Sequence, residues 1–357
     1  MTATISAMLL DWYDVHARDL PWRTAPGADG GGGATPDPYR VWLSEIMLQQ
    51  TTVAAVRPYF EAFTQTWPTI GALAAAPEEQ VMAAWAGLGY YSRARNLVKT
   101  ARLVAARGTF PDTEAELRAL PGIGDYTAAA IAAIAFGRRA VVVDANVERV
   151  VARLFAIREP LPGARRAIRA AADRITPDDR AGDFAQAMMD LGSSICTARD
   201  ARCLICPLST ECRARAEGDP TSLPVKAAKK AKPVRRGTAF WMERAGADGP
   251  EVWLVTRPAR GMLGGMKALP DDGWSASADG HGNPPLPGEW RAGGVVRHTF
   301  THAVLELGVV TRTDCDRPPP GEGAWWPVAA LEQAGLPTLF AKAARLVLAR
   351  DEGAGAS

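Results

Sequence analysis

The sequence predicts a mostly α-helical domain followed by a smaller α+β domain. Residues 1–225 are rich in Ala, Leu and Arg, and their apolar residues recur at intervals of three or four, as in amphipathic helices. Residues 226–236 are basic and carry little apolar content. The chain beyond them alternates short runs of Val, Leu and Trp with Gly- and Pro-rich turns, a pattern typical of strands. A length of 357 residues agrees with about two domains.

These changes in composition set the expected domain boundaries. We place the helical domain at residues 1–225, a basic linker at 226–236, the α+β domain at 237–350 and a flexible tail at 351–357. In the first domain, Pro and Gly divide the periodic runs into short helices, and a four-glycine run at residues 30–33 indicates a loop insertion. In the second domain, strands are expected at residues 251–256, 293–296 and 302–307.

The net charge of +2 hides an uneven distribution. Residues 1–225 carry 24 Lys and Arg against 25 Asp and Glu, whereas residues 226–236 carry six positive charges and no negative one. A nucleic-acid site in the near-neutral first domain would therefore be a local patch. No apolar run reaches the roughly 18–20 residues that span a bilayer, and no basic segment opens a secretory signal. We expect a cytoplasmic bacterial protein that is monomeric and has no membrane partner.

Four of the five cysteines lie in one short loop, and the fifth, Cys315, is isolated. The loop spans residues 196–212 with the spacing C-x6-C-x2-C-x5-C, and its cysteines are Cys196, Cys203, Cys206 and Cys212. Such clustering without a secretion signal favours a metal site over disulfides. Zinc modules usually pair two C-x2–4-C knuckles, and this loop has a single knuckle. The spacing favours a [4Fe–4S] cluster and leaves zinc as the alternative.

A glycine-rich hairpin, Leu120-Pro-Gly-Ile-Gly124, precedes the apolar helical run that begins at residue 128. Gly122 and Gly124 allow positive φ angles and the close approach of another backbone. Successive N–H groups at the start of a helix form an anion site, so the hairpin is a candidate for binding a DNA phosphate. An ordinary helix–turn–helix connection is the alternative.

Several segments of the first domain match one protein family in chain order. They are Leu20-Pro-Trp-Arg23, Tyr39-Arg-Val-Trp-Leu-Ser-Glu-Ile-Met-Leu-Gln-Gln-Thr51, Gly87-Leu-Gly-Tyr-Tyr-Ser-Arg-Ala-Arg-Asn96, Leu120-Pro-Gly-Ile-Gly-Asp-Tyr-Thr127, Val143-Asp-Ala-Asn-Val147, Phe184-Ala-Gln-Ala-Met-Met-Asp-Leu-Gly192 and the cysteine loop. With them the chain resembles the helix–hairpin–helix DNA glycosylase superfamily, and within it the MutY-type adenine DNA glycosylases. The region 237–350 is more weakly similar to the MutT-like, Nudix-type domain of that family.

The resemblance implies the activity and the partner. The enzyme would remove undamaged adenine mispaired with 8-oxoguanine or guanine in duplex DNA, and it would leave an abasic site. It would be associated with the nucleoid through DNA. The cysteine loop would hold a [4Fe–4S] cluster and place Arg199, Arg202, Arg213 and Arg215 near phosphates.

Cleaving an N-glycosidic bond needs an acid for the leaving base and a carboxylate for the cationic sugar. Glu45 lies in a predominantly apolar helix, and such surroundings raise a carboxyl pKa. The resemblance implies that Glu45 acts at adenine N7. Asp144 precedes a helical run, where an N-cap is the ordinary role of aspartate. The resemblance implies instead that Asp144 faces the anomeric carbon, with Asn146 in the same motif.

The first domain has few residues that could act as the nucleophile or base of a lyase. Endonuclease III-type relatives form a Schiff base with a lysine after the hairpin, and that position is Tyr126 in this chain. Residues 1–225 contain one lysine, Lys99, and one histidine, His16. An amine nucleophile and a histidine base are therefore nearly unavailable, which predicts a monofunctional enzyme. A bifunctional glycosylase/lyase and a non-catalytic iron–sulfur DNA-binding protein are the alternatives, and an electron carrier would not need the hairpin.

A base in a duplex must be extruded before it reaches a catalytic group. The resemblance implies that Gln50 and Tyr90 enter the base stack, with Leu48 close by. It also implies that Arg23 and Gln186 read the flipped adenine, and a Gln amide can pair with both a donor and an acceptor edge. Tyr90 lies close to Arg93-x-Arg95, an arrangement suited to stacking and phosphate contact.

The α+β domain departs from two family patterns. It lacks the Glu-rich Nudix helix, so nucleotide hydrolysis is not expected there. The Phe-Ser-His loop of the family reads Phe300-Thr301-His302. Because Thr keeps the hydroxyl, we expect 8-oxoguanine recognition to survive. Thr301 is the first candidate, followed by His298 and His302.

Overall fold

The structure is a computed structural model. It describes residues 2–27, 36–227, 231–258, 262–300, 302–315 and 317–354. Its contacts divide the chain into two compact units, Met1–Ala228 and Lys229–Ser357. The predicted glycine-rich insertion at residues 30–33 and the last residues of the predicted tail, 355–357, lie outside the described residues.

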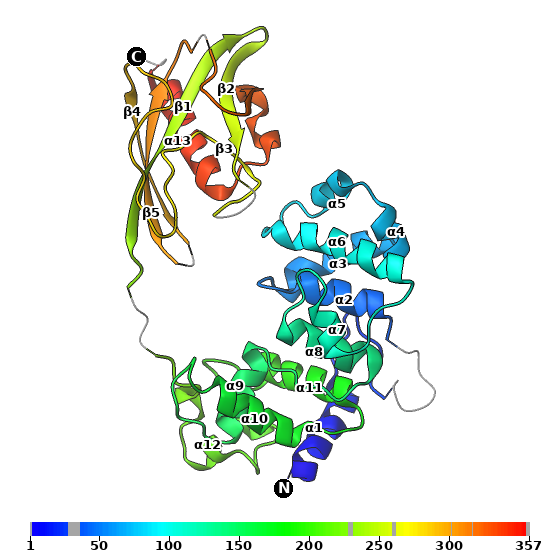
Figure 1. Ribbon diagram of the computed structural model, residues 1–357. Coiled ribbons are helices and arrows are strands. Elements are labelled where there is room, and N and C mark those ends of the chain that lie inside the picture. Colours follow the sequence, from blue (N-terminus) through cyan, green and yellow to red (C-terminus); the bar gives the residue numbers. More distant parts are fainter. Residues whose placement is uncertain are drawn as a thin grey trace. The chain divides into compact units, whose positions relative to one another are not determined.

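The first unit is helical, as predicted (Figure 1). Its α-helices are α1 (Thr2–His16), α2 (Pro38–Met47), α3 (Val53–Thr66), α4 (Ile70–Ala75), α5 (Glu78–Ala84), α6 (Ser92–Arg107), α7 (Glu114–Arg118), α8 (Asp125–Phe136), α9 (Ala145–Leu154), α10 (Arg165–Ile175), α11 (Ala181–Ser194) and α12 (Arg213–Ala216). Two 3-10 turns, η2 (Cys203–Ile205) and η3 (Pro220–Ser222), lie in the cysteine loop and after it.

Helix α8 lies at the centre of this unit. Every residue from Thr127 to Ala135 is buried, because α8 is apolar on all sides and is enclosed by its neighbours. Helices α2, α7 and α11 pack against it. The small alanine side chains of α8 let these helices approach closely. The N-terminus of α8 therefore carries the hairpin on a helix whose position is fixed by packing.

The second unit is a mixed sheet with helices (Figure 1). Its elements are β1 (Val234–Gly246), β2 (Gly249–Thr256), β3 (Lys267–Ala268), β4 (Arg291–Thr299), β5 (Val304–Arg312), β6 (Gly323–Pro327), η4 (Val328–Ala334) and α13 (Thr338–Ala354). The strand order is β3-β2-β1-β5-β4, and β6 pairs with β2. Strand β1 runs parallel to β5, whereas the other pairs are antiparallel.

Alternation along the strands gives this sheet two apolar faces. Ala239 and Trp241 of β1 join a core that includes α13 residues, whereas Phe240 and Met242 of the same strand join a smaller core on the other face. The smaller core includes Cys315, which is buried. The isolated cysteine of the sequence is thus part of a sheet face.

Two predicted boundaries are wrong by a few residues. Strand β1 begins at Val234, inside the predicted linker 226–236, because residues 234–236 pair with β5. Burial alternates along these residues as in a strand, but the basic side chains of Arg235 and Arg236 make the segment resemble a linker in the sequence. Helix α13 continues to Ala354, so the first residues of the predicted tail 351–357 are helical.

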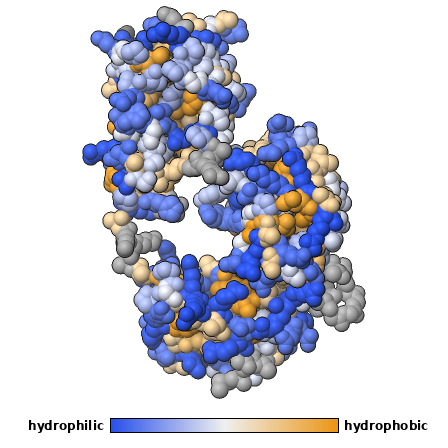
Figure 2. Space-filling model, viewed as in Figure 1, coloured by the Kyte–Doolittle hydropathy of each residue, from blue (hydrophilic) through white to orange (hydrophobic). Residues whose placement is uncertain are grey.

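The surface of the chain is mainly hydrophilic in the view of Figure 2, with small separate hydrophobic patches. Within the described residues, no helix combines the length and the apolar character that crossing a membrane requires.

Candidate active site

Seven of the residues singled out from the sequence line one cavity of about 190 Å³ in the helical unit. They are Arg23, Glu45, Leu48, Tyr126, Asp144, Asn146 and Gln186. They come from five parts of the chain: the loop after α1, the end of α2, and the starts of α8 and α9, together with α11. Packing of α2 and α11 against α8 therefore assembles the cavity.

Glu45 belongs to the buried face of α2, with Leu43 and Ile46 among its buried neighbours. The side chain is 7% exposed, and burial raises the pKa of Glu45 to about 7. Hydrogen bonding with Tyr126 lowers this pKa in part, and the charge of Asp144 raises it. The expected elevation of the Glu45 pKa is thus confirmed, and its main cause is loss of water around the charged form. A large fraction of Glu45 holds a proton at neutral pH.

Asp144 occupies the N-cap of α9. One carboxylate oxygen accepts a hydrogen bond from the Val147 backbone N–H at 2.7 Å, and the other accepts one from Asn146 Nδ2 at 2.8 Å. The ordinary capping role and a place in the cavity are therefore both found for this residue. Capping orients the carboxylate at a helix N-terminus.

Arg23 is held by a residue that the sequence analysis did not single out, Asp190 of α11. Its two terminal nitrogens donate to the two carboxylate oxygens of Asp190 at 2.7 and 3.0 Å, in a bidentate pair. Arg18 donates to the same carboxylate through Nε at 2.6 Å. Although burial raises the pKa of Asp190, these two arginines bring it below its usual value. The pair orients Arg23 beside Glu45, whose pKa the arginine lowers.

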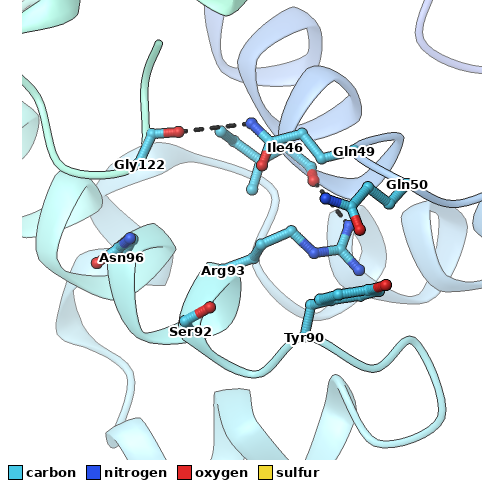
Figure 3. A pocket seen from close by; sticks show the side chains of 8 residues that line it. All are labelled: Ile46, Gln49, Gln50, Tyr90, Ser92, Arg93, Asn96 and Gly122. Carbon is cyan, nitrogen blue, oxygen red and sulfur yellow. Dashed lines mark hydrogen bonds between the residues drawn. The ribbon is translucent and has the colours of Figure 1, made fainter. Parts of the chain in front are cut away.

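A second cavity, of about 240 Å³, contains the residues expected to enter the base stack (Figure 3). Gln50 and Tyr90 line it, and both adopt left-handed backbone conformations with φ of 58° and 49°. The Tyr90 side chain is 58% exposed, as insertion into DNA requires. Gln49, which the sequence analysis passed over, donates to the Gly122 carbonyl at 3.4 Å and so connects the end of α2 with the hairpin.

The hairpin lies between α7 and α8, and its two glycines differ. Gly122 has φ of +79°, and a Cβ there would lie 2.9 Å from Asn96 Cβ, so glycine is required. Gly124 is the N-cap of α8 with φ of −95°, so only Gly122 uses the positive φ that glycine allows. A Cβ at Gly124 would meet nothing within 4 Å, which leaves the start of α8 open to another molecule. The geometry suits an anion approaching backbone N–H groups.

The four cysteines of the loop 196–212 line one cavity. Within the described residues, no group of three or more His, Cys, Asp or Glu side chains is placed to hold a single metal ion. Four thiols around a common space are the donor set of an iron–sulfur cluster.

Two arginines of α9, Arg149 and Arg153, hold the cysteine loop in place. Arg153 is buried and donates to the Cys196 sulfur at 3.2 Å and to the Thr197 carbonyl at 2.7 Å. Arg149 donates to the Cys196 carbonyl at 2.7 Å and to Asn146 Oδ1 at 2.9 Å. Hydrogen bonds therefore connect the loop with Asn146, the residue that donates to Asp144. Among the predicted arginines, Arg202 and Arg215 line the cysteine cavity.

The sheet unit carries the remaining candidates in the turn between β4 and β5. Phe300 packs against His298, with ring centroids 4.6 Å apart, and burial lowers the pKa of His298. His302 is exposed, whereas Thr301 lies outside the described residues. The Lys232 amine donates to the Phe300 carbonyl at 2.7 Å and so anchors the turn.

Comparisons with known proteins give both parts of the chain a family. Residues 43–176 match the HhH-GPD superfamily of base excision DNA repair proteins, and residues 240–346 match the NUDIX domain. Adenine DNA glycosylase of Homo sapiens is 34% identical over 97% of this chain and 74% of its own length. That of Arabidopsis thaliana is 40% identical over 75% of this chain and 47% of its own length. A solved thermostable thymine-DNA glycosylase, 28% identical, gives a TM-score of 0.53 over 60% of this chain and 97% of its own.

Proposed function

Because the chain belongs to the adenine DNA glycosylase family of base-excision-repair enzymes, we propose that it hydrolyses the glycosidic bond of adenine opposite 8-oxoguanine or guanine in duplex DNA. One observation carries the proposal: Glu45 and Asp144 line the same cavity from different helices, in different surroundings. Glycosidic bond cleavage needs two carboxyl groups with separate roles.

Glu45 is the acid of the proposed reaction. With a pKa of about 7 it holds a proton at neutral pH that it can deliver to adenine N7. Protonation makes adenine a better leaving group, so the C1′–N9 bond breaks with its electron pair moving to the base. The resulting Glu45 carboxylate can then accept a proton from the attacking water.

Asp144 stabilises the cationic sugar that remains. Its carboxylate is fixed by the Val147 N–H and by Asn146 Nδ2, so little reorganisation is needed when positive charge develops at C1′. Arg23 and Gln186 line the same cavity and offer hydrogen bonds to the extruded base.

The proposed enzyme removes the base without cleaving the strand. Tyr126 replaces the lysine of lyases, and burial raises the pKa of its phenol well above the ordinary value, so it stays neutral. Lys99 is exposed on α6 and does not line the cavity. Borohydride trapping of an enzyme–DNA adduct that is lost in Lys99→Ala would contradict this.

We further propose that Cys196, Cys203, Cys206 and Cys212 hold a [4Fe–4S] cluster. The cluster supplies structure by fixing the loop, and Arg149 and Arg153 orient the loop on α9. In this proposal the sheet unit reads the opposite base, because its sequence Phe300-Thr301-His302 retains a hydroxyl residue.

The test is adenine release from duplexes that contain A·8-oxoguanine, under single-turnover conditions. Wild type should release adenine, and Glu45→Gln should be slower by about 10²–10⁴-fold. Gln186→Ala is a second variant, which should weaken base recognition without removing the acid. No release by wild type would disprove the activity, and an unimpaired Glu45→Gln would disprove the role of Glu45.

A further inference from the structure

Arg93 differs from the other arginines near the stacking cavity because its guanidinium is buried. Arg93 is 8% exposed, although it follows the exposed Tyr90 by only three positions. Among the described residues, no carboxylate forms an ion pair with it. The pattern Arg93-x-Arg95 suits stacking and phosphate contact in the sequence, whereas the guanidinium of Arg93 is buried in the protein.

The guanidinium is instead hydrogen-bonded to two separate backbone segments. Figure 3 shows Arg93 between Ile46, which belongs to the first segment, and Tyr90, which follows the second. One terminal nitrogen donates to the carbonyls of Ile46 and Met47, the last residues of α2, at 3.1 and 2.9 Å. The other donates to the carbonyls of Leu88 and Gly89, at 3.1 and 3.3 Å. The carbonyls at a helix C-terminus lack partners and carry partial negative charge, so α2 supplies the compensation that a carboxylate would otherwise give.

These two segments are the ones that present the stacking side chains. Gln50 follows the end of α2, and Arg93 also donates to Thr51 Oγ1 at 3.3 Å, on the other side of Gln50. Tyr90 follows Gly89, and its ring lies 5.5 Å from the guanidinium carbon. Arg93 therefore contacts the backbone before Gln50, the side chain of the residue after Gln50, and the backbone directly before Tyr90.

Both stacking residues need such support. Gln50 and Tyr90 have φ of 58° and 49°, a conformation that L-residues other than glycine rarely adopt. A strained backbone of this kind persists where the surrounding contacts determine it. The Arg93 side chain joins both segments by hydrogen bonds.

We propose that Arg93 is a positioning residue for base extrusion, which holds Gln50 and Tyr90 at a fixed separation before DNA arrives and acts through them. The inference rests on the proposed function because it assigns those two residues to the gap left by the extruded base. Arg93 itself would make no phosphate contact.

The test uses the full chain with Glu45→Gln added to stop excision, and a duplex in which 2-aminopurine replaces the target adenine. Its fluorescence rises on unstacking, so the amplitude on binding reports extrusion independently of catalysis. We expect Arg93→Met to lower this amplitude at least tenfold, with the dissociation constant for DNA changed less than threefold. Arg102→Met, an exposed arginine of the same helix, is the matched control and should match the parent.

Two further measurements separate positioning from other roles. If Arg93 contacts a phosphate, Arg93→Met should lower the slope of log K against log salt concentration by about one and leave extrusion intact. That result would overturn the proposal. In a background that carries both Gln50→Ser and Tyr90→Ser, Arg93→Met should add less than a twofold further loss, because a residue that acts through these two side chains is not additive with their removal. Additive losses would also overturn it.

A folding defect and a failure of the proposed function give different results. If Arg93→Met unfolds, Arg93→Lys keeps the charge but cannot reach both segments, so it should fold and still lose most of the extrusion signal; a full signal would overturn the proposal. If unmodified wild type excises no adenine while extrusion depends on Arg93, the proposed function fails and this inference stands. If excision is normal and Arg93→Met behaves like Arg102→Met, this inference fails alone.

Discussion

Glu45 and Asp144 line one cavity from two regions whose physical character is opposite. On α2, Glu45 is buried, and this burial raises its pKa to about 7. At the start of α9, both oxygens of Asp144 accept hydrogen bonds from N–H groups. The comparison shows how a helix interior and a helix N-terminus can give two carboxyl groups different roles within one cavity. Each prediction below alters one side of this comparison.

The largest effect is expected from Asp144→Asn. The amide keeps the N-cap of α9 but loses the negative charge, so single-turnover adenine release should fall by about 10²–10³-fold with the melting temperature nearly unchanged. Asp144→Ala should add a loss of about 1 kcal/mol in the free energy of unfolding. Thr113→Ala, which removes the N-cap of α7 away from the cavity, is the stability control and should leave the rate intact. A full rate in Asp144→Asn would show that the charge is dispensable.

The pH dependence of the rate should report Glu45. The protonated form is the donor, so the single-turnover rate should be constant well below pH 7 and fall about tenfold per unit well above it. DNA binding by Glu45→Gln, measured over the same range, controls for loss of affinity. A rate that rises through pH 7 would indicate that Glu45 acts first as a base.

A smaller loss is expected from Asn146→Ala, which removes one of the two hydrogen bonds to Asp144. The carboxylate becomes less well oriented, so the rate should fall by roughly tenfold, on the scale of about 1.4 kcal/mol for one hydrogen bond to a charged group. Gly192 packs against this residue, since a Cβ there would lie 2.6 Å from Asn146 Cβ. Ala at position 146 keeps that contact, so a large fall in stability would mean that Asn146 acts in folding.

The smallest effect concerns stability. The Glu45 pKa is raised from 4.5 in the reference state to about 7 in the fold, so its stabilising contribution is complete below pH 4.5 and is lost as pH rises through 7. As pH rises from 4.5 to 8, the unfolding free energy of the helical unit should fall by about 1–3 kcal/mol more in wild type than in Glu45→Gln. Denaturant titrations of both proteins at pH 4.5 and 8 measure it. An equal change with pH in both would place the Glu45 carboxyl in contact with water.

The sequence predicted the cavity residues through motifs that carry local chemistry. Glu45, Asp144 and Gln186 each lie in a short segment whose pattern resembles one family, and the structure brings them together. The motif shows only that glycine occurs at Gly122 and Gly124, so the sequence could not tell which of them has a positive φ. An N-cap with an extended backbone and a turn with positive φ use glycine for different reasons.

The supporting residues could not be found in the same way. Arg93, Asp190 and Arg153 are charged residues that are buried, and charged side chains are mostly exposed, so their sequence gives no sign of burial. Their partners are backbone carbonyls or residues distant in sequence, as with Arg23 and Asp190. Only the packing of α2, α6, α9 and α11 creates these contacts. The early start of β1 was hidden for a similar reason, because its pairing with β5 depends on distant residues.

The buried helix α8 connects the proposed phosphate site with the base cavity. The proposed phosphate site at Gly124 and the cavity residue Tyr126 are separated by two residues on one rigid helix, or about 3 Å along its axis. Inserting a single residue between them would rotate Tyr126 by about 100° relative to the hairpin and point it away from Glu45. The hairpin and the opening of the base cavity therefore keep a fixed position relative to each other. A phosphate bound at the hairpin would thus lie at a fixed distance from the base cavity.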